Sequence, residues 1–107
     1  MFLFLVPTNP TIDKLKPFLT KIEITWNEPK VKNGIIKLYE ICWLKAKDNI
    51  VGPTCQTKSE PDRNFDIENL NPGITYIVTI NASTSAGFGP ADKKKVETLK
   101  SGKLTTL

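Results

Sequence analysis

The sequence predicts an all-β fold in which two antiparallel sheets pack face to face. Short segments of alternating apolar and polar residues recur along the 107 residues, and turn-forming residues separate them. No stretch carries the 3.6-residue periodicity of a long amphipathic helix. Regularly spaced short strands without helices are typical of β-sandwiches and barrels.

The first two strands are predicted on either side of a proline. The first is placed near residues 11–16, because Pro17 argues against a helix that continues through this region. The second covers KIEITW at residues 21–26, where isoleucines and Trp26 alternate with polar residues. Pro29 cannot donate a hydrogen bond to a central ladder, so the second strand ends before it.

A turn at Asn33-Gly34 leads into a third strand within residues 35–46. Apolar residues fall on both faces of this strand. Because aromatic side chains bury the largest area, we place the odd-numbered face inward. The inward face carries Tyr39, Ile41 and Trp43, and the outward face carries Leu38, Cys42 and Leu44.

Two more strands and a corner are predicted in the middle of the chain. A turn near Asp48-Asn49 separates the third strand from a short strand at residues 54–58. A further strand around Phe65 ends before the corner Asn71-Pro72-Gly73, and a regular strand around residues 76–82 follows it.

The last part of the chain predicts a loop and an edge strand. Residues 83–90 contain two glycines and a proline and are interpreted as an exposed loop. A final strand is expected over about residues 93–99, and its Lys93-Lys94-Lys95 run suits a sheet edge, where charge discourages pairing with other chains. The result is about seven strands in an immunoglobulin-like antiparallel β-sandwich.

Three motifs follow one another at a spacing that a generic sandwich does not require. They are ITW followed by EP, then NGIIxxYEIxW, then LNPGITYxVxIxAxTxxGFGP. Together they resemble the fibronectin type III family over residues 10–99, with residues 1–9 and 100–107 as terminal or linker segments. The sequences of these motifs are most similar to modules of receptor-type tyrosine phosphatases and neural cell-adhesion receptors. The chain contains neither the RGD tripeptide nor a WSxWS motif.

The resemblance implies roles for particular residues. Trp26 matches the tryptophan that crosses the middle of the core. Leu70, Pro72 and Tyr76 match a corner whose tyrosine hydroxyl bonds to nearby backbone. Gly87, Gly89 and Pro90 match the glycine-rich loop between the last two strands. The predicted structural core is Trp26, Tyr39, Ile41, Leu70, Tyr76 and Val78.

The two cysteines are predicted to form a disulfide. Cys42 and Cys55 each lie about six residues from the centre of the turn near Asp48-Asn49, so a symmetric hairpin places them opposite each other. Cys42 points outward, and an exposed free thiol is unfavourable outside the cell. The alternative is a pair of free thiols, which a cytosolic protein would allow.

A glycosylation sequon and several outward-facing apolar residues are expected on the surface. Asn81-Ala82-Ser83 is a glycosylation sequon whose Asn81 lies on the outward face, although such triplets also arise by chance. Phe88, in the loop at residues 83–90, is expected to be partly exposed and to pack against an adjacent domain. The outward Leu38, Leu44 and Ile77 form either an adhesive patch or ordinary scattered surface residues, and we favour the second interpretation.

Composition argues against several functional classes. The chain has no His, and its 15 Lys and Arg against 11 Asp and Glu include a single Arg, Arg63. We therefore expect no catalytic site, no cofactor, no metal site and no nucleic-acid binding. The carboxylates Asp62, Asp66 and Glu68 lack the spacing of a calcium loop. The longest apolar run, FLFLVP, is far shorter than the roughly 20 residues of a membrane span.

These observations predict a non-catalytic extracellular interaction or spacer module, not an enzyme. Its parent is expected to be a cell-surface adhesion or signalling receptor, for example a receptor-type tyrosine phosphatase. Its partners are expected to be proteins, and the isolated domain is expected to be monomeric. The alternatives are an intracellular structural module of a muscle-type tandem-repeat protein and an accessory domain of a carbohydrate-active enzyme.

Overall fold

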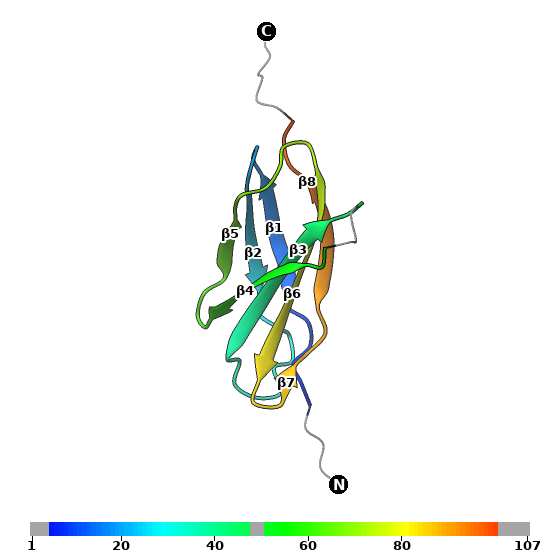
Figure 1. The fold of residues 1–107 in the computed structure, drawn as a ribbon. Coiled ribbons are helices and arrows are strands. Elements are labelled where there is room, and N and C mark those ends of the chain that lie inside the picture. Colours follow the sequence, from blue (N-terminus) through cyan, green and yellow to red (C-terminus); the bar gives the residue numbers. More distant parts are fainter. Residues whose placement is uncertain (1–4, 48–50, 101–107) are drawn as a thin grey trace.

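The computed structural model describes residues 5–47 and 51–100, which form two facing antiparallel sheets (Figure 1). The smaller sheet has the order β1 (Thr11–Pro17), β2 (Ile22–Asn27) and β5 (Asn64–Ile67). The larger sheet contains β4 (Thr54–Ser59), β3 (Leu38–Lys45), β6 (Thr75–Thr84), β7 (Gly87–Phe88) and β8 (Asp92–Glu97). The prediction of an all-β sandwich is confirmed.

The end of the chain differs from the prediction. The segment at residues 83–90 is not simply an exposed loop, because β6 runs on to Thr84 and the short strand β7 pairs with its end. Gly87 makes the tight turn possible with a φ of 121°, a value that residues with side chains rarely adopt. The predicted final strand corresponds to β8, and β7 is an additional strand within the predicted loop, so the described residues contain eight strands where about seven were expected.

The inner faces of the two sheets bury the apolar core. The six residues predicted for it are all buried, and the most exposed of them, Leu70, has an exposed fraction of 7%. The rings of Trp26 and Tyr39 meet across the sheets with centroids 5.4 Å apart. Trp43, also placed inward, is only partly buried and stacks against Phe65. The rest of the core is mainly aliphatic, with Ile22 and Ile24 from β2, Ile41 from β3, and Val78 and Ile80 from β6.

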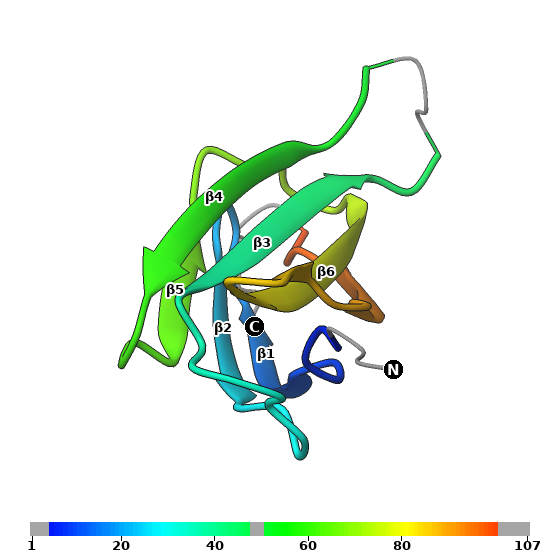
Figure 2. The same cartoon turned by 90° about the horizontal axis from the view of Figure 1, so that it is seen from below.

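One edge of the larger sheet lies where the charge pattern predicted it. β8 pairs only with β6 within the larger sheet, so the Lys93-Lys94-Lys95 run lies on an edge strand. Register places Lys93 and Lys95 on the outer face and Lys94 on the other. At the opposite edge, β4 pairs with β3 and with no other strand of the described residues. Figure 2 shows β4 at the outside of this sheet.

The chain enters and leaves the sandwich at opposite ends (Figure 1). We call the entry end, with residues 5–10, the β2–β3 loop and the β6–β7 turn, the N-terminal pole. Here Thr8 donates from its backbone to Val31, and a Cβ at Gly89 would collide with the carbonyl oxygen of Pro7. We call the other end, with the β1–β2 and β5–β6 connections, the C-terminal pole. There the amide of Leu99 donates to Phe18.

Candidate functional site

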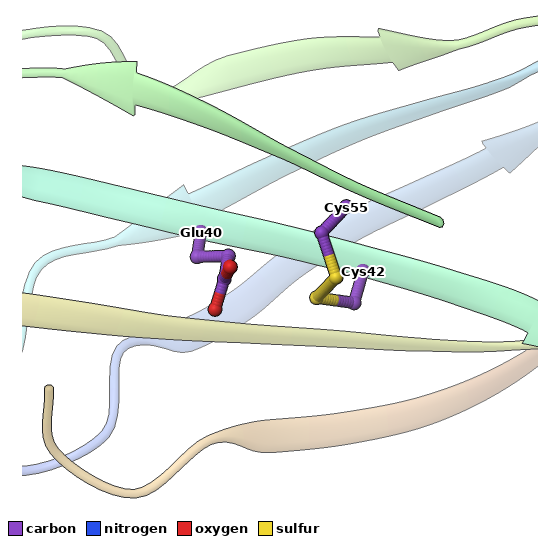
Figure 3. Close-up of side chains that lie close together, drawn as sticks. All are labelled: Glu40, Cys42 and Cys55. Atoms are coloured by element: carbon purple, nitrogen blue, oxygen red, sulfur yellow. A yellow bond between two sulfur atoms is a disulfide. The ribbon is translucent and has the colours of Figure 1, made fainter. Parts of the chain in front are cut away.

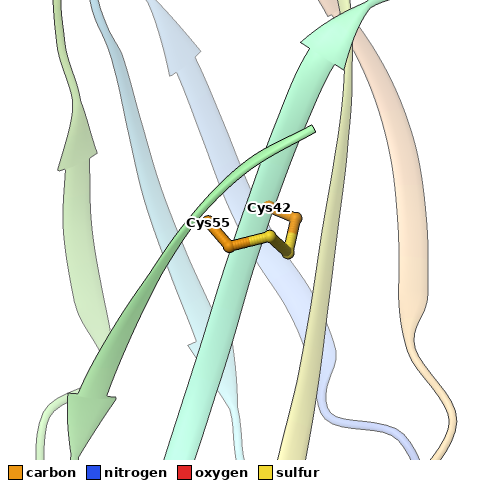
Figure 4. Close-up of a disulfide and its surroundings, with 2 residues drawn as sticks. All are labelled: Cys42 and Cys55. Carbon is orange, nitrogen blue, oxygen red and sulfur yellow. A yellow bond between two sulfur atoms is a disulfide. The ribbon is translucent and has the colours of Figure 1, made fainter. Parts of the chain in front are cut away.

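The disulfide lies on the outer face of the larger sheet. Cys42 of β3 and Cys55 of β4 occupy directly opposed positions, with an S–S distance of 2.09 Å and Cα atoms 4.1 Å apart (Figure 4). Cys42 is half-buried and Cys55 is exposed. A short Cα separation is typical of a non-hydrogen-bonded pair, so the backbone groups of Cys55 point toward the free edge of β4. The predicted turn centre at Asp48-Asn49 lies outside the described residues.

A carboxylate lies beside the disulfide. Glu40 is two residues before Cys42 on β3 and shares its outer face (Figure 3). One of its oxygens and the two sulfur atoms lie within 4.8 Å of one another. While the sulfurs are bonded to each other, this group offers a metal ion only the Glu40 carboxylate. A zinc site in a protein needs three or four protein ligands. In the oxidised protein the cluster is therefore a disulfide with an acidic neighbour.

The sequon lies on the same outer face. Asn81 pairs with Glu40 across β6 and β3, and its side-chain amide donates to the carbonyl of Gly89 at 3.4 Å. Ser83, the third residue of the sequon, has an exposed fraction of only 6%. The register places it between Leu38 and Phe88 on the outer face, so these two larger side chains flank it.

The three outward apolar residues do not form one patch. Leu44 and Ile77 are paired on β3 and β6, and both are half-buried. Leu38 lies six positions earlier on β3, beyond Glu40 and Cys42. Its cross-strand neighbour on β6 is Ser83, which agrees with the interpretation of scattered surface residues.

The N-terminal pole gathers most of the exposed apolar side chains. Phe88 has an exposed fraction of 43%, within the expected range for a partly exposed residue. Five of the seven large apolar residues that are exposed in the described chain lie at this pole, and we name them the pole cluster: Leu5, Val31, Ile35, Leu38 and Phe88. Sequence reasoning singled out only two of them. The signal for Val31 and Ile35 was their position on either side of the Asn33-Gly34 turn, and Leu5 lies in the opening apolar run.

A charged network surrounds Tyr39. Its hydroxyl donates to Glu60 at 2.8 Å, and Arg63 donates to the same carboxylate at 2.6 Å. Arg63 also lies over the Tyr39 ring and pairs with Glu28 at 3.2 Å. Burial, together with the hydrogen bond to Glu60, raises the pKa of Tyr39. The hydrogen bond from Lys32, assisted by Arg63, lowers the pKa of Glu28.

The second tyrosine closes the corner that the family resemblance implied. The backbone N–H of Asn71 donates to the Tyr76 hydroxyl at 2.9 Å. Sequence reasoning missed a further member of this corner, Thr98, which has an exposed fraction of 1%. Its hydroxyl donates to the carbonyl of Asn71 at 2.5 Å and accepts from the amide of Ile74 at 3.0 Å. In the sequence, the only sign of this role was a threonine that directly follows the charged edge strand.

The described residues show surface clefts but no assembled catalytic group. One cleft of about 300 Å³ is lined by Trp43, Leu70 and Tyr76, among others. A more open one of about 490 Å³ includes Trp26, Glu28 and Arg63 in its walls, and the last two of these form an ion pair. Neither cleft brings a nucleophile together with a base in the part of the chain that the structure describes. Within the same residues, no helix is long and apolar enough to cross a membrane.

Two of the three acidic residues that were considered for calcium form ion pairs with lysines. Asp62 pairs with Lys58 at 3.3 Å, and Asp66 pairs with Lys21 at 3.7 Å. Both carboxylates are about half exposed, so these pairs contribute little to stability.

Comparison with known proteins identifies the family. The family model of the fibronectin type III domain matches residues 6–98. A sidekick homolog of Caenorhabditis elegans is 40% identical over 69% of this chain. Ephrin type-A receptor 7 of Gallus gallus is 39% identical over 64% of the chain, and the receptor-type tyrosine-protein phosphatase U of the same species is 31% identical over 77%. The chain spans only 3%, 7% and 6% of the lengths of these relatives.

A solved structure supports the same assignment. The FN1–FN3 domains of chicken CNTN1 superpose with a TM-score of 0.71 and 25% identity, over 92% of this chain and 31% of that one. The predicted resemblance to modules of receptor phosphatases and adhesion receptors is thus confirmed. A domain match that covers nearly the whole chain, two facing antiparallel sheets and the tyrosine corner agree, and the chain belongs to the fibronectin type III family.

Proposed function

We propose that this domain is a non-catalytic extracellular module that spaces and orients its neighbours in the ectodomain of a cell-surface adhesion or signalling receptor. The observation that carries the proposal is the polarity of the sandwich. The chain enters at a pole with exposed apolar side chains and leaves at a pole closed by hydrogen bonds. Its relatives include receptors and a receptor phosphatase, so a receptor-type tyrosine phosphatase is a parent of the kind we propose.

Two features support an extracellular location. A disulfide on an exposed face persists in an oxidising compartment and is rare in the cytosol. Asn81 lies on the same outer face as a sequon residue, and we propose that it carries a glycan that is attached before Ser83 is buried by folding. A cytosolic muscle-type module would have neither the bond nor the glycan.

The partners that we propose are proteins. The single arginine is held by Glu28 and Glu60, so it is not free to bind phosphates. The three lysines on β8 point to two different faces of the sheet, so they do not form one strong binding site for an anionic partner. The domain acts as a monomer, without cofactor or metal and without inserting into a membrane.

Phe88 is the proposed contact to the preceding module of the same polypeptide. That module is tethered to the N-terminal pole, because residues 5–10 run along it. Phe88 and Leu38 lie on either side of Ser83 on the outer rim of this pole, and Ile35, with an exposed fraction of 82%, is the most exposed large apolar residue of the described chain. Covering such side chains removes apolar area from water, which stabilises the contact by about 25 cal/mol per Å².

The test uses a segment of the parent chain that contains this domain and the module before it. Small-angle X-ray scattering or residual dipolar couplings measure the distribution of angles between the two modules. We expect a narrow distribution for the wild type, a broader one for Phe88→Ser, and no change for Leu99→Ser, which alters an exposed apolar residue at the opposite pole. An unchanged distribution in Phe88→Ser would refute the contact.

A further inference from the structure

We propose that Cys42–Cys55 is a thiol–disulfide exchange site. Its substrate is a dithiol reductant, Glu40 slows the attack, and reduction releases the edge strand β4 while the two-sheet core stays folded. The proposal goes beyond a spacer role and concerns this chain alone, whatever its parent protein does.

The bond is accessible to a reductant. Both cysteines point to the outer face of the larger sheet, and Cys55 is exposed on a strand that pairs on one side only. A thiolate must approach the attacked sulfur from behind, along the S–S axis, so the sulfur of the more exposed cysteine is the one attacked. Exposed disulfides are the labile ones, whereas those buried in a core resist reduction.

The bond is also local. It joins cysteines 13 residues apart and crosses one hairpin ladder, that of β3 and β4. No residue of β4 belongs to the buried apolar core. β3 is held independently by its pairing with β6, which extends from Leu38 to Lys45. Once the bond is lost, β4 is held mainly by its ladder to β3, so this strand is the first to separate, and its release leaves the inner faces of the two sheets in contact.

Glu40 sets the electrostatics of the exchange. Its carboxylate lies within 4.8 Å of both sulfurs, where it repels an incoming thiolate and disfavours the thiolate that leaves. The other outer-face neighbours given by the register, Thr57, Thr79 and Asn81, are uncharged. The nearest cation on that face by register, Lys93, lies beyond Thr79 on β8. One unit charge at this distance in water changes a rate about three- to fivefold.

The chemistry balances with a dithiol. A thiolate of the reductant attacks the sulfur of Cys55, the S–S bond breaks, and Cys42 leaves as a thiolate that takes up a proton. The second thiol of the reductant then loses its proton to solvent and attacks the mixed disulfide, and Cys55 leaves as a thiolate that takes up a proton. The protein gains two thiols, and the reductant becomes a disulfide.

The first test measures the rate of reduction of the folded chain by dithiothreitol, followed by mass after the new thiols are alkylated. We expect a rate proportional to the reductant concentration, and Glu40→Gln should react about three- to fivefold faster at low salt. Glu97→Gln, on an edge strand distant in register, is the matched control and should react like the wild type. With a neutral phosphine, which carries no charge for Glu40 to repel, the gain in Glu40→Gln should be smaller.

Two outcomes would overturn the exchange site. One is a reduction rate that saturates at the rate of global unfolding, since the bond would then open only in the unfolded chain. The other is an unchanged rate in Glu40→Gln.

The second test compares hydrogen exchange in the oxidised chain and in the reduced, alkylated chain. We expect protection to be lost over residues 54–59 and kept in β2 and β6. Loss of protection across β2 and β6, or unchanged protection in β4, would contradict the release of a single edge strand.

Discussion

The two poles of the sandwich are held by a tyrosine each, and the two hydroxyls act in opposite ways. Tyr76, at the C-terminal pole, accepts from the backbone amide of Asn71. Tyr39, on the side of the N-terminal pole, donates to the carboxylate of Glu60. Both rings are almost fully buried, with exposed fractions of 3% and 0%.

The two poles therefore differ in the groups that bond to their tyrosines. The Tyr76 corner consists of neutral groups, and Thr98 completes it with bonds to backbone. The Tyr39 network depends on the charges of Glu60, Arg63 and Glu28, and it adjoins the pole that leaves apolar side chains exposed. A closed, neutral pole and a charged, partly apolar pole suit a module whose two ends have different neighbours.

Removing either ring gives the largest expected effect. Tyr39→Ala and Tyr76→Ala should each lower the free energy of unfolding by about 3–5 kcal/mol, because both leave large core cavities. Urea unfolding followed by tryptophan fluorescence measures the change. If one substitution costs far more than the other, the two poles differ in packing and not only in their hydroxyls.

The hydroxyl of Thr98 should be the next most important group. Thr98→Val keeps the shape but leaves the amide of Ile74 and the carbonyl of Asn71 without their partner, at a cost of about 2–3 kcal/mol. Thermal unfolding measures the loss, and Thr79→Val, on the outer face, is the control that should change little. A neutral result for Thr98→Val would mean that water replaces the hydroxyl.

The tyrosine hydroxyl at the C-terminal pole should matter less. Tyr76→Phe removes the acceptor of the Asn71 amide and should cost about 1–2 kcal/mol. Amide exchange provides a local readout, since the protection of Asn71 should fall. Full protection in the variant would show that the hydroxyl is not its partner.

The Tyr39 hydroxyl should contribute less to stability at neutral pH than the hydroxyls of Thr98 and Tyr76. Tyr39→Phe should cost about 1 kcal/mol or less, because Glu60 keeps its bond to Arg63. The pKa of Tyr39 is raised in the folded state, so its contribution is complete below the pKa of an unfolded tyrosine and declines as pH rises above it. The wild type should therefore lose its advantage over Tyr39→Phe in alkaline solution. A difference that is constant with pH would contradict this assignment.

Acid should act on the same side of the molecule, with the smallest effect. The pKa of Glu28 is lowered in the folded state, so its stabilising effect is present above the unfolded value near 4.5 and is lost as pH falls through the folded one. An NMR titration of the Glu28 carboxyl measures the shift directly, and Lys32→Ala should move the midpoint upward. A midpoint that Lys32→Ala leaves unchanged would exclude the ion pair as its cause.

Sequence reasoning recovered the elements whose signal is local. Alternation predicted β2 and β6, and turn chemistry predicted the corner before Tyr76. The symmetry of the hairpin around Asp48-Asn49 predicted that Cys42 and Cys55 face each other, and the two occupy paired positions. These features depend on residues that are close in sequence or on one repeating period.

Features that depend on distant residues could not be found in this way. The bonds of Thr98 join it to residues more than 20 positions earlier, and those of Arg63 reach Glu28 across 35 positions. The pairing of Phe88 with Ser83 converted part of a predicted loop into β7. The pole cluster formed because the chain entry, the β2–β3 loop and the β6–β7 turn meet, which no single segment indicates.

Surface labelling of the full-length parent protein tests the proposed function most directly. An antibody raised against this folded domain is applied to intact cells and, separately, to permeabilised cells. An extracellular module predicts strong labelling of the intact cells, with no further gain at the plasma membrane after permeabilisation. Labelling that requires permeabilisation would contradict the proposal and place the domain inside the cell.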